Sequence, residues 1–256
     1  MQEPGIKNTT LRYSCIGCGI CCKGRLVPLT LAETEQWLAR GHHVAIILEA
    51  FNELTWPTTS SHYVHNAARS VAVNEADNSI RVIAVFVGNA LEQCPNLRPD
   101  NLCGIYEERP LVCRIYPMEI NPFIEVDPKN KICPPESWGS GEILCTDGVA
   151  NPELQALVNL SREADIIDAS IKVAICAQLG IKVASWKENG FAIYFPERLE
   201  MMDAIRESNN IVIDHWAKGW KVRVDDQLLR QLLLEGNVPL SDCEPADYIF
   251  HKLSSA

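Results

Sequence analysis

Four cysteines fall within eight residues near the start of the chain. They are Cys15, Cys18, Cys21 and Cys22. Thiolates are soft ligands for zinc and for iron–sulfur clusters. The glycines at positions 17 and 19 let a loop turn tightly without Cβ clashes, so its thiols can converge. The run predicts the first half of a metal site, and a group of buried or disulfide-bonded cysteines is the alternative.

The spacing of the first three cysteines narrows the choice of metal. Cysteines 15, 18 and 21 keep the C-x-x-C-x-x-C pattern that binds three corners of a 4Fe-4S cluster, with a fourth ligand from elsewhere. Zinc usually takes two cysteines from each of two knuckles, so 4Fe-4S is favoured and zinc is the alternative. Side chains of adjacent residues diverge, which predicts that Cys22 serves a second site or is a free reactive thiol.

Remote ligands are available in a proline-rich stretch downstream. They are Cys94, Cys103, Cys113 and Cys133. The eight cysteines divide into two four-thiolate sites, or into one site plus structural or redox-active thiols, and both arrangements stay open. Our prediction is a 4Fe-4S centre on the three spaced cysteines and one remote cysteine. Cys22 and the other three then form or support a second site.

A longer motif surrounds the seventh of these cysteines. Residues 106–117 read Tyr-x-x-Arg-Pro-x-x-Cys-Arg-x-Tyr-Pro. With the flanking cysteines, this order resembles the CxxCxxCC family of YkgJ-type cysteine-cluster proteins, described as zinc- or iron-chelating. The resemblance covers roughly residues 13–135 and implies a metal or iron–sulfur site on the eight cysteines. One branch, the flagellin lysine N-methylases, would imply a cluster-dependent enzyme that uses S-adenosylmethionine, but the chain has no glycine-rich nucleotide loop.

Four further residues of this motif are candidates for contact with the cofactor. Arg109 and Arg114 could offset the negative charge of a thiolate cluster or hold an anionic substrate. The alternative is that Arg109 pairs with Glu107 or Glu108 inside its loop. Tyr106 and Tyr116 are expected to pack over the site and keep water from it.

The other cysteines lack partners at ligand spacing. Cys176 lies in a helical apolar pattern and is expected to be a core residue. Cys145 follows the cluster closely enough to be a spare ligand, and Cys243 has no assigned role.

Charge and hydropathy limit the partners and the compartment. The formal net charge is −10, which opposes binding to nucleic acids and to anionic membranes. The N-terminus lacks the apolar run of a signal peptide, and no stretch is long enough for a membrane span. These features predict a cytoplasmic protein that works with a protein or redox partner. In a reducing compartment, eleven cysteines are better explained by metal than by disulfides.

The predicted fold is α+β, with two domains. Residues 1–140 would form a cysteine-rich, loop-rich metal-binding domain with a small hairpin made by residues 70–74 and 80–87. Residues 141–256 would be mainly helical, with helices over 151–179, 197–208 and 227–234. Residues 44–51 fit either a helix or a strand, and 123–126 are expected to form a short strand.

Overall fold

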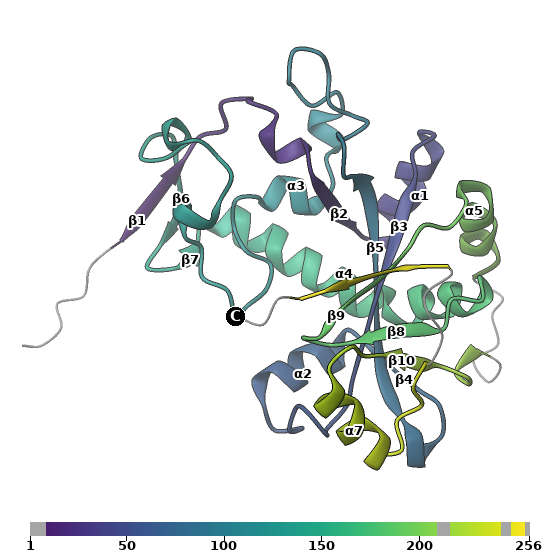
Figure 1. Cartoon of the computed structure of the whole chain (residues 1–256). Helices are drawn as coiled ribbons and strands as arrows, with labels where there is room; N and C mark the ends of the chain where they lie inside the picture. Colours follow the sequence, from purple (N-terminus) through teal and green to yellow (C-terminus); the bar gives the residue numbers. More distant parts are fainter. Residues whose placement is uncertain (1–8, 209–215, 242–246, 254–256) are drawn as a thin grey trace, which may run out of the picture. The chain divides into compact units, whose positions relative to one another are not determined.

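A computed structural model describes residues 9–208, 216–241 and 247–253 of the chain (Figure 1). The fold is α+β, as predicted. It divides into two compact units, each discontinuous in sequence. The cysteine unit comprises Met1–Val27 and Asn89–Glu163, and the sheet unit comprises Pro28–Gly88 and Ala164–Ala256. The contiguous division into residues 1–140 and 141–256 stays a prediction about folding domains.

The cysteine unit contains little regular structure. Its sheet has the order β1-β6-β7, with β1 (Thr10–Tyr13), β6 (Glu142–Thr146) and β7 (Val149–Ala150). Its short helices are η1 (Ile20–Cys22), η3 (Tyr106–Glu108), α3 (Leu111–Ile115), η4 (Pro128–Asn130) and η5 (Pro135–Ser137). Proline removes a backbone donor and limits helix length, which accounts for these brief turns. The prediction of a short strand at residues 123–126 is wrong, because this segment forms no strand.

A small apolar core lies where the sheet of this unit meets the first half of α4 (Pro152–Gln178). Its buried members are Leu111, Ile115, Leu144, Ala150, Leu154 and Val158. Asn151 fixes the start of the helix. Its side chain accepts a hydrogen bond from the Leu154 backbone at 2.8 Å and donates one to the Ile143 carbonyl at 2.7 Å. Asn151 therefore caps the helix predicted over residues 151–179, which is continuous to Gln178.

The sheet unit is built on an eight-stranded mixed sheet whose main path is β10-β8-β3-β5-β2. Its strands are β2 (Arg25–Leu29), β3 (Val44–Phe51), β4 (Val71–Val73), β5 (Ile80–Ala90), β8 (Val183–Trp186), β9 (Gly190–Tyr194), β10 (Lys221–Arg223) and β11 (Ile249–Lys252). β3 pairs antiparallel with β5 from Val44↔Gly88 to Phe51↔Arg81. All but one residue of β3 is buried, so its sequence shows no alternation and fits a helix equally well.

Helices complete the sheet unit. They are α1 (Leu31–Ala39), α2 (Ser61–Ala68), α5 (Arg198–Glu207), α7 (Gln227–Glu235) and the second half of α4. Thr30 and Glu33 form a capping box at the start of α1. The predicted hairpin is confirmed as the antiparallel pair β4–β5. A Cβ at Gly88 would lie 2.6 Å from the Trp37 ring, so glycine is needed for this packing. No helix within the described residues is long and apolar enough to span a bilayer.

Candidate metal centre

All eight predicted ligands belong to the cysteine unit. Seven are half-buried and Cys15 is exposed. The first segment of the sheet unit, Pro28–Gly88, lies between Cys22 and Cys94 in the sequence, yet the thiols before and after it are gathered in the same compact unit. This distribution explains why the cysteines lie so far apart in the sequence.

Two glycines shape the loop that carries the first four cysteines. Gly17 and Gly19 have φ values of 67° and 71°, in the left-handed region that favours glycine. A Cβ at Gly17 would lie 2.8 Å from Leu102, and one at Gly19 would lie 3.0 Å from Asn101. The loop can therefore pack closely against the 101–102 turn of the second cysteine segment.

Backbone hydrogen bonds join the first cysteine run to the second. The Cys94 amide donates to the Cys22 carbonyl at 2.7 Å. Beyond it, Leu97 and Cys103 form an isolated β-bridge, and the Gly104 amide donates to the Asn96 carbonyl at 2.7 Å. Three of the predicted ligands, at positions 22, 94 and 103, are thus held by one small hydrogen-bonded turn.

The adjacent cysteines do not diverge as their sequence positions suggest. The Sγ atoms of Cys21 and Cys22 are 3.9 Å apart, because the 3-10 turn η1 places both thiols on one side of the loop. Two thiolates on one tetrahedral zinc, at a zinc–sulfur distance of about 2.3 Å, lie about 3.8 Å apart. This pair can therefore share one ion.

Neighbouring thiols shift the pKa values of Cys21, Cys22, Cys94 and Cys113. Burial, and then the negative charges of Cys94, Cys21 and Cys103, raise the pKa of Cys113 to about 12. Burial and Cys103 also raise the pKa of Cys94. The hydrogen bond between the adjacent thiols lowers the pKa of Cys21 to about 6 and raises that of Cys22, so this pair holds one proton more readily than two or none. The raised pKa values favour the neutral thiols at Cys22, Cys94 and Cys113, so metal binding would have to displace their protons.

Cys133 lies between two tyrosine hydroxyls. Its Sγ atom is 3.3 Å from the Tyr13 hydroxyl and 3.5 Å from the Tyr116 hydroxyl. Burial, then the hydrogen bond to Cys133, raises the pKa of each tyrosine well above its ordinary value. Cys15 and Cys21 add smaller contributions at Tyr13, so these thiols also lie near it. Both hydroxyls therefore stay protonated. The Cys133 thiol donates to the Tyr116 hydroxyl, and in the contact with Tyr13 either atom can be the donor.

The motif residues predicted to contact the cofactor occupy different environments. The Arg109 guanidinium stacks 3.7 Å from the Tyr106 ring centre, and its Nε donates to the Tyr106 carbonyl. Tyr106 is 53% exposed, which gives it little capacity to cover the thiols. Tyr116 is half-buried, and the guanidinium of Arg25 lies 5.4 Å from its ring centre. Arg114 is exposed on α3.

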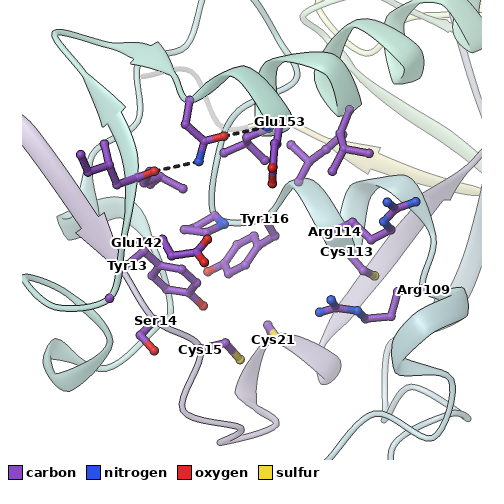
Figure 2. Close-up of a pocket in the computed structure, with 18 of the residues that line it drawn as sticks. Tyr13, Ser14, Cys15, Cys21, Arg109, Cys113, Arg114, Tyr116, Glu142 and Glu153 are labelled. Carbon is purple, nitrogen blue, oxygen red and sulfur yellow. Dashed lines mark hydrogen bonds between the residues drawn. The ribbon is translucent and has the colours of Figure 1, made fainter.

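A cavity of about 520 Å³ opens beside these thiols within the cysteine unit (Figure 2). The thiols of Cys15, Cys21 and Cys113 line it together with Arg109 and Arg114. The cavity thus brings together cysteines from both halves of the motif and both candidate arginines.

The comparison with known families agrees with this arrangement. Residues 14–134, just under half of the chain, match the model of the CxxCxxCC family, a putative zinc- or iron-chelating domain. These residues are similar to that family, and we refer to them below as the CxxCxxCC domain. Neither the curated proteins nor the solved structures include a match to the chain. A metal-binding role is therefore supported.

The donor set of the CxxCxxCC domain fits a thiophilic metal. Within the described residues its cysteines form no disulfide, and they are gathered in one unit where they shift one another's pKa values, which suits zinc or iron–sulfur ligation. Within the described residues, no three His, Cys, Asp or Glu side chains already surround one point in metal-binding geometry. Side-chain rotation of the thiols would have to accompany binding.

Sequence reasoning missed several residues around the CxxCxxCC thiols. Tyr13, Arg25, Glu142 and Glu153 carry no motif of their own, and the two acids come from outside the matched segment. The position of Tyr13, two residues before Cys15, is the one signal that could have drawn attention to it.

The remaining cysteines are placed more simply. Cys145 is buried on β6, and Cys176 is fully buried in α4, which confirms its core role. Cys243 lies outside the described residues.

Proposed function

We propose that the CxxCxxCC domain holds a 4Fe-4S centre that transfers electrons or supports a partner enzyme. The ligands would be Cys15, Cys18, Cys21 and, as the remote fourth, Cys113. The observation that carries this choice is the cavity, which the thiols of cysteines 15, 21 and 113 line together. Their spacing fits three corners of one cluster and a distant fourth ligand.

Charge and burial around this set favour a redox centre. The positive charges of Arg25 and Arg109 act on Cys21, and Arg109 acts on Cys113 as well. Positive charge beside a thiolate-bound cluster stabilises its reduced, more negative state and raises its reduction potential. Cys22 and the remaining three remote cysteines, Cys94, Cys103 and Cys133, would form or support a second site. Cys22, Cys94 and Cys103 share a separately hydrogen-bonded turn. A redox role on thiolate ligands would imply a reducing compartment and a redox partner protein.

The test compares a proposed ligand with a matched cysteine. The Cys113→Ala variant should lose cluster iron, sulfide and visible absorbance after anaerobic purification. The Cys145→Ala variant is the control, because Cys145 lies in the same unit but outside the coupled thiols. Unchanged iron and sulfide in Cys113→Ala would reject this residue as the fourth ligand.

A structural zinc site is the second candidate, favoured by the Cys21–Cys22 contact. Their 3.9 Å sulfur separation matches two ligands of one tetrahedral ion, whereas each thiolate of a 4Fe-4S cube binds its own iron. In this case the purified protein would be colourless and contain stoichiometric zinc. Replacing Cys22 with alanine would then release zinc, whereas the 4Fe-4S proposal predicts that the first cluster is retained.

A further inference from the structure

We propose that Cys21 and Cys22 form an oxidation site, at which a hydroperoxide converts the two adjacent thiols into a reversible vicinal disulfide. The disulfide removes Cys21 from the ligands of the 4Fe-4S centre, so its effect on metal binding rests on the proposed function. The oxidation itself depends only on the geometry and the access of the two thiols.

The two sulfurs already lie in contact. Their Sγ atoms are 3.9 Å apart, and among the described residues no other two cysteines are joined by a hydrogen bond. Both residues belong to the 3-10 turn η1. A disulfide bond is about 2.05 Å long, so the sulfurs must approach by a further ~1.9 Å, which side-chain rotation can supply. Each of the two thiols is therefore the nearest reaction partner of the other.

Access separates this pair from the cysteines of regular structure. Both thiols are half-buried, so a molecule as small as hydrogen peroxide can reach them. Cys145 and Cys176 are buried in β6 and α4, and within the described residues no hydrogen bond joins either one to another thiol. Access to the oxidant and a neighbouring thiol are the two features that favour reversible oxidation of a cysteine to a disulfide.

The reaction takes two steps and is balanced by the hydroperoxide. The Sγ atom of one cysteine attacks an oxygen of hydrogen peroxide, the O–O bond breaks, and the products are a sulfenic acid and water. The Sγ atom of the second cysteine then attacks the oxidised sulfur, the S–O bond breaks, and the hydroxide leaves as water with the proton of the attacking thiol. The two thiols lose two electrons and two protons in total, and hydrogen peroxide is reduced to two water molecules.

The short span between the two residues makes this disulfide easy to reduce. Their peptide bond is trans, which places the two Cα atoms about 3.8 Å apart. Most disulfides join Cα atoms about 4.4–6.8 Å apart, and departure from this range strains the bond. Strained disulfides are the labile and regulatory ones. A dithiol reductant therefore restores both thiols and the ligand at Cys21.

The experiment maps disulfides in the purified full-length protein. A metal-depleted sample is treated with hydrogen peroxide, its remaining thiols are blocked with N-ethylmaleimide, and tryptic fragments are sequenced by mass spectrometry. Trypsin releases residues 13–23, which carry all four clustered cysteines. The expected fragment has lost two hydrogens at Cys21 and Cys22 and carries N-ethylmaleimide on its other two cysteines. Dithiothreitol added before blocking should restore labelling of all four.

Single variants trap the intermediate. In Cys22→Ser the second thiol is missing, so dimedone present during oxidation should label a sulfenic acid at Cys21, and Cys21→Ser reports in the same way on Cys22. Cys145→Ser is the matched control and should form the vicinal disulfide to the same extent as the unchanged protein. Absence of the dimedone label from both variants contradicts the sulfenic acid route.

Cobalt(II) binding measures the effect on the metal site, because thiolate–cobalt complexes absorb visible light. Loss of a group that only orients a metal ligand costs about 10–100-fold in metal affinity, so loss of the ligand Cys21 should weaken cobalt(II) binding at least about tenfold. Reduction with dithiothreitol, followed by its removal, should restore the affinity. Equal cobalt(II) affinity of the oxidised and reduced proteins would show that the disulfide does not control the metal site.

The outcomes separate this proposal from the metal proposal. Full labelling of Cys21 and Cys22 after peroxide treatment, or a disulfide from either one to a third cysteine, overturns the oxidation site and leaves the metal proposal standing. A vicinal disulfide in a protein that contains no metal as purified and binds no cobalt(II) supports the oxidation site and contradicts the metal proposal.

Discussion

The cysteine unit and the sheet unit reach a compact fold by different means. β3 and β5 of the sheet unit are largely buried along their whole pairing, and Trp37, Phe51 and Phe86 fill the core around them. The core of the cysteine unit has six buried apolar residues, while its longest loops run between half-buried thiols. Burial of apolar surface can stabilise the sheet unit alone, whereas the cysteine unit needs an added cross-link.

The fate of cysteine side chains follows the same division. Burial raises the pKa of Cys176 well above its ordinary value, and this thiol packs as a small apolar group. In the cysteine unit the thiols approach one another instead, and their mutual repulsion opposes ionisation. The helix of the sheet unit buries its cysteine as a core residue, whereas the loops of the cysteine unit bring their thiols close to one another.

Metal removal should produce the largest difference in stability between the two units. Chelation after mild acidification should remove most hydrogen-exchange protection from residues 94–115, because thiolate–metal bonds can contribute on the order of 10 kcal/mol to folding such a region. The amides of β3 and β5 should keep their protection. Equal loss in both units, or no loss in either, would break the comparison.

A cavity in the sheet core should produce the converse effect. Leu48→Ala, at a fully buried position of β3, should lower the free energy of unfolding of the sheet unit by about 2–5 kcal/mol, since truncation leaves a void. Urea unfolding would measure this change. Metal content at low urea should equal that of the unchanged protein, and loss of metal would show that the units are not independent.

The ion pair between Glu49 and Lys187 gives a smaller test of the sheet unit. The Lys187 Nζ atom lies 2.8 Å from both carboxylate oxygens, and both side chains are mostly buried. Glu49→Leu should cost about 3 kcal/mol because it leaves the ammonium group unpaired, and adding Lys187→Met should recover much of this loss. Failure of the double variant to recover stability would show that the pair contributes more than charge compensation.

Glycine substitutions in the cysteine loop should have the smallest effect on stability. Gly17→Ala and Gly24→Ala both place a side chain at positive φ, at a cost of about 1–2 kcal/mol. Only the first also brings a Cβ to 2.8 Å from Leu102, since the space around Gly24 is open. Metal occupancy should therefore fall in Gly17→Ala and stay unchanged in Gly24→Ala. Equal occupancy would show that close packing of this loop is not needed for binding.

Local signals in the sequence predicted elements well where the chain controls its own geometry. The Thr30–Glu33 capping box, the Asn151 cap and the β4–β5 hairpin are all present in the structure. Strand β3 could not be distinguished from a helix, because burial on both faces removes the alternation that reveals a strand. Strands β8 and β9 lie in the region predicted to be mainly helical, and the sequence did not indicate them as strands.

The sequence predicted which residue types form the site, but not which of these residues lie close together. Spacing identified the eight cysteines. Their gathering in one compact unit depends on the path of the chain, in which a segment of the sheet unit interrupts the cysteine unit. The 3.9 Å distance between the Sγ atoms of Cys21 and Cys22 depends on a 3-10 turn that no sequence pattern predicts. Glu142 and Glu153 reach the cavity through tertiary packing alone.

The most direct test of the central claim is metal analysis after anaerobic purification, with visible absorption recorded on the same sample. The proposal predicts a brown protein that contains iron and acid-labile sulfide in equal amounts, at about four of each per cluster. It also predicts that both are lost in Cys113→Ala and kept in Cys145→Ala. A colourless protein with stoichiometric zinc and no sulfide would contradict the iron–sulfur assignment.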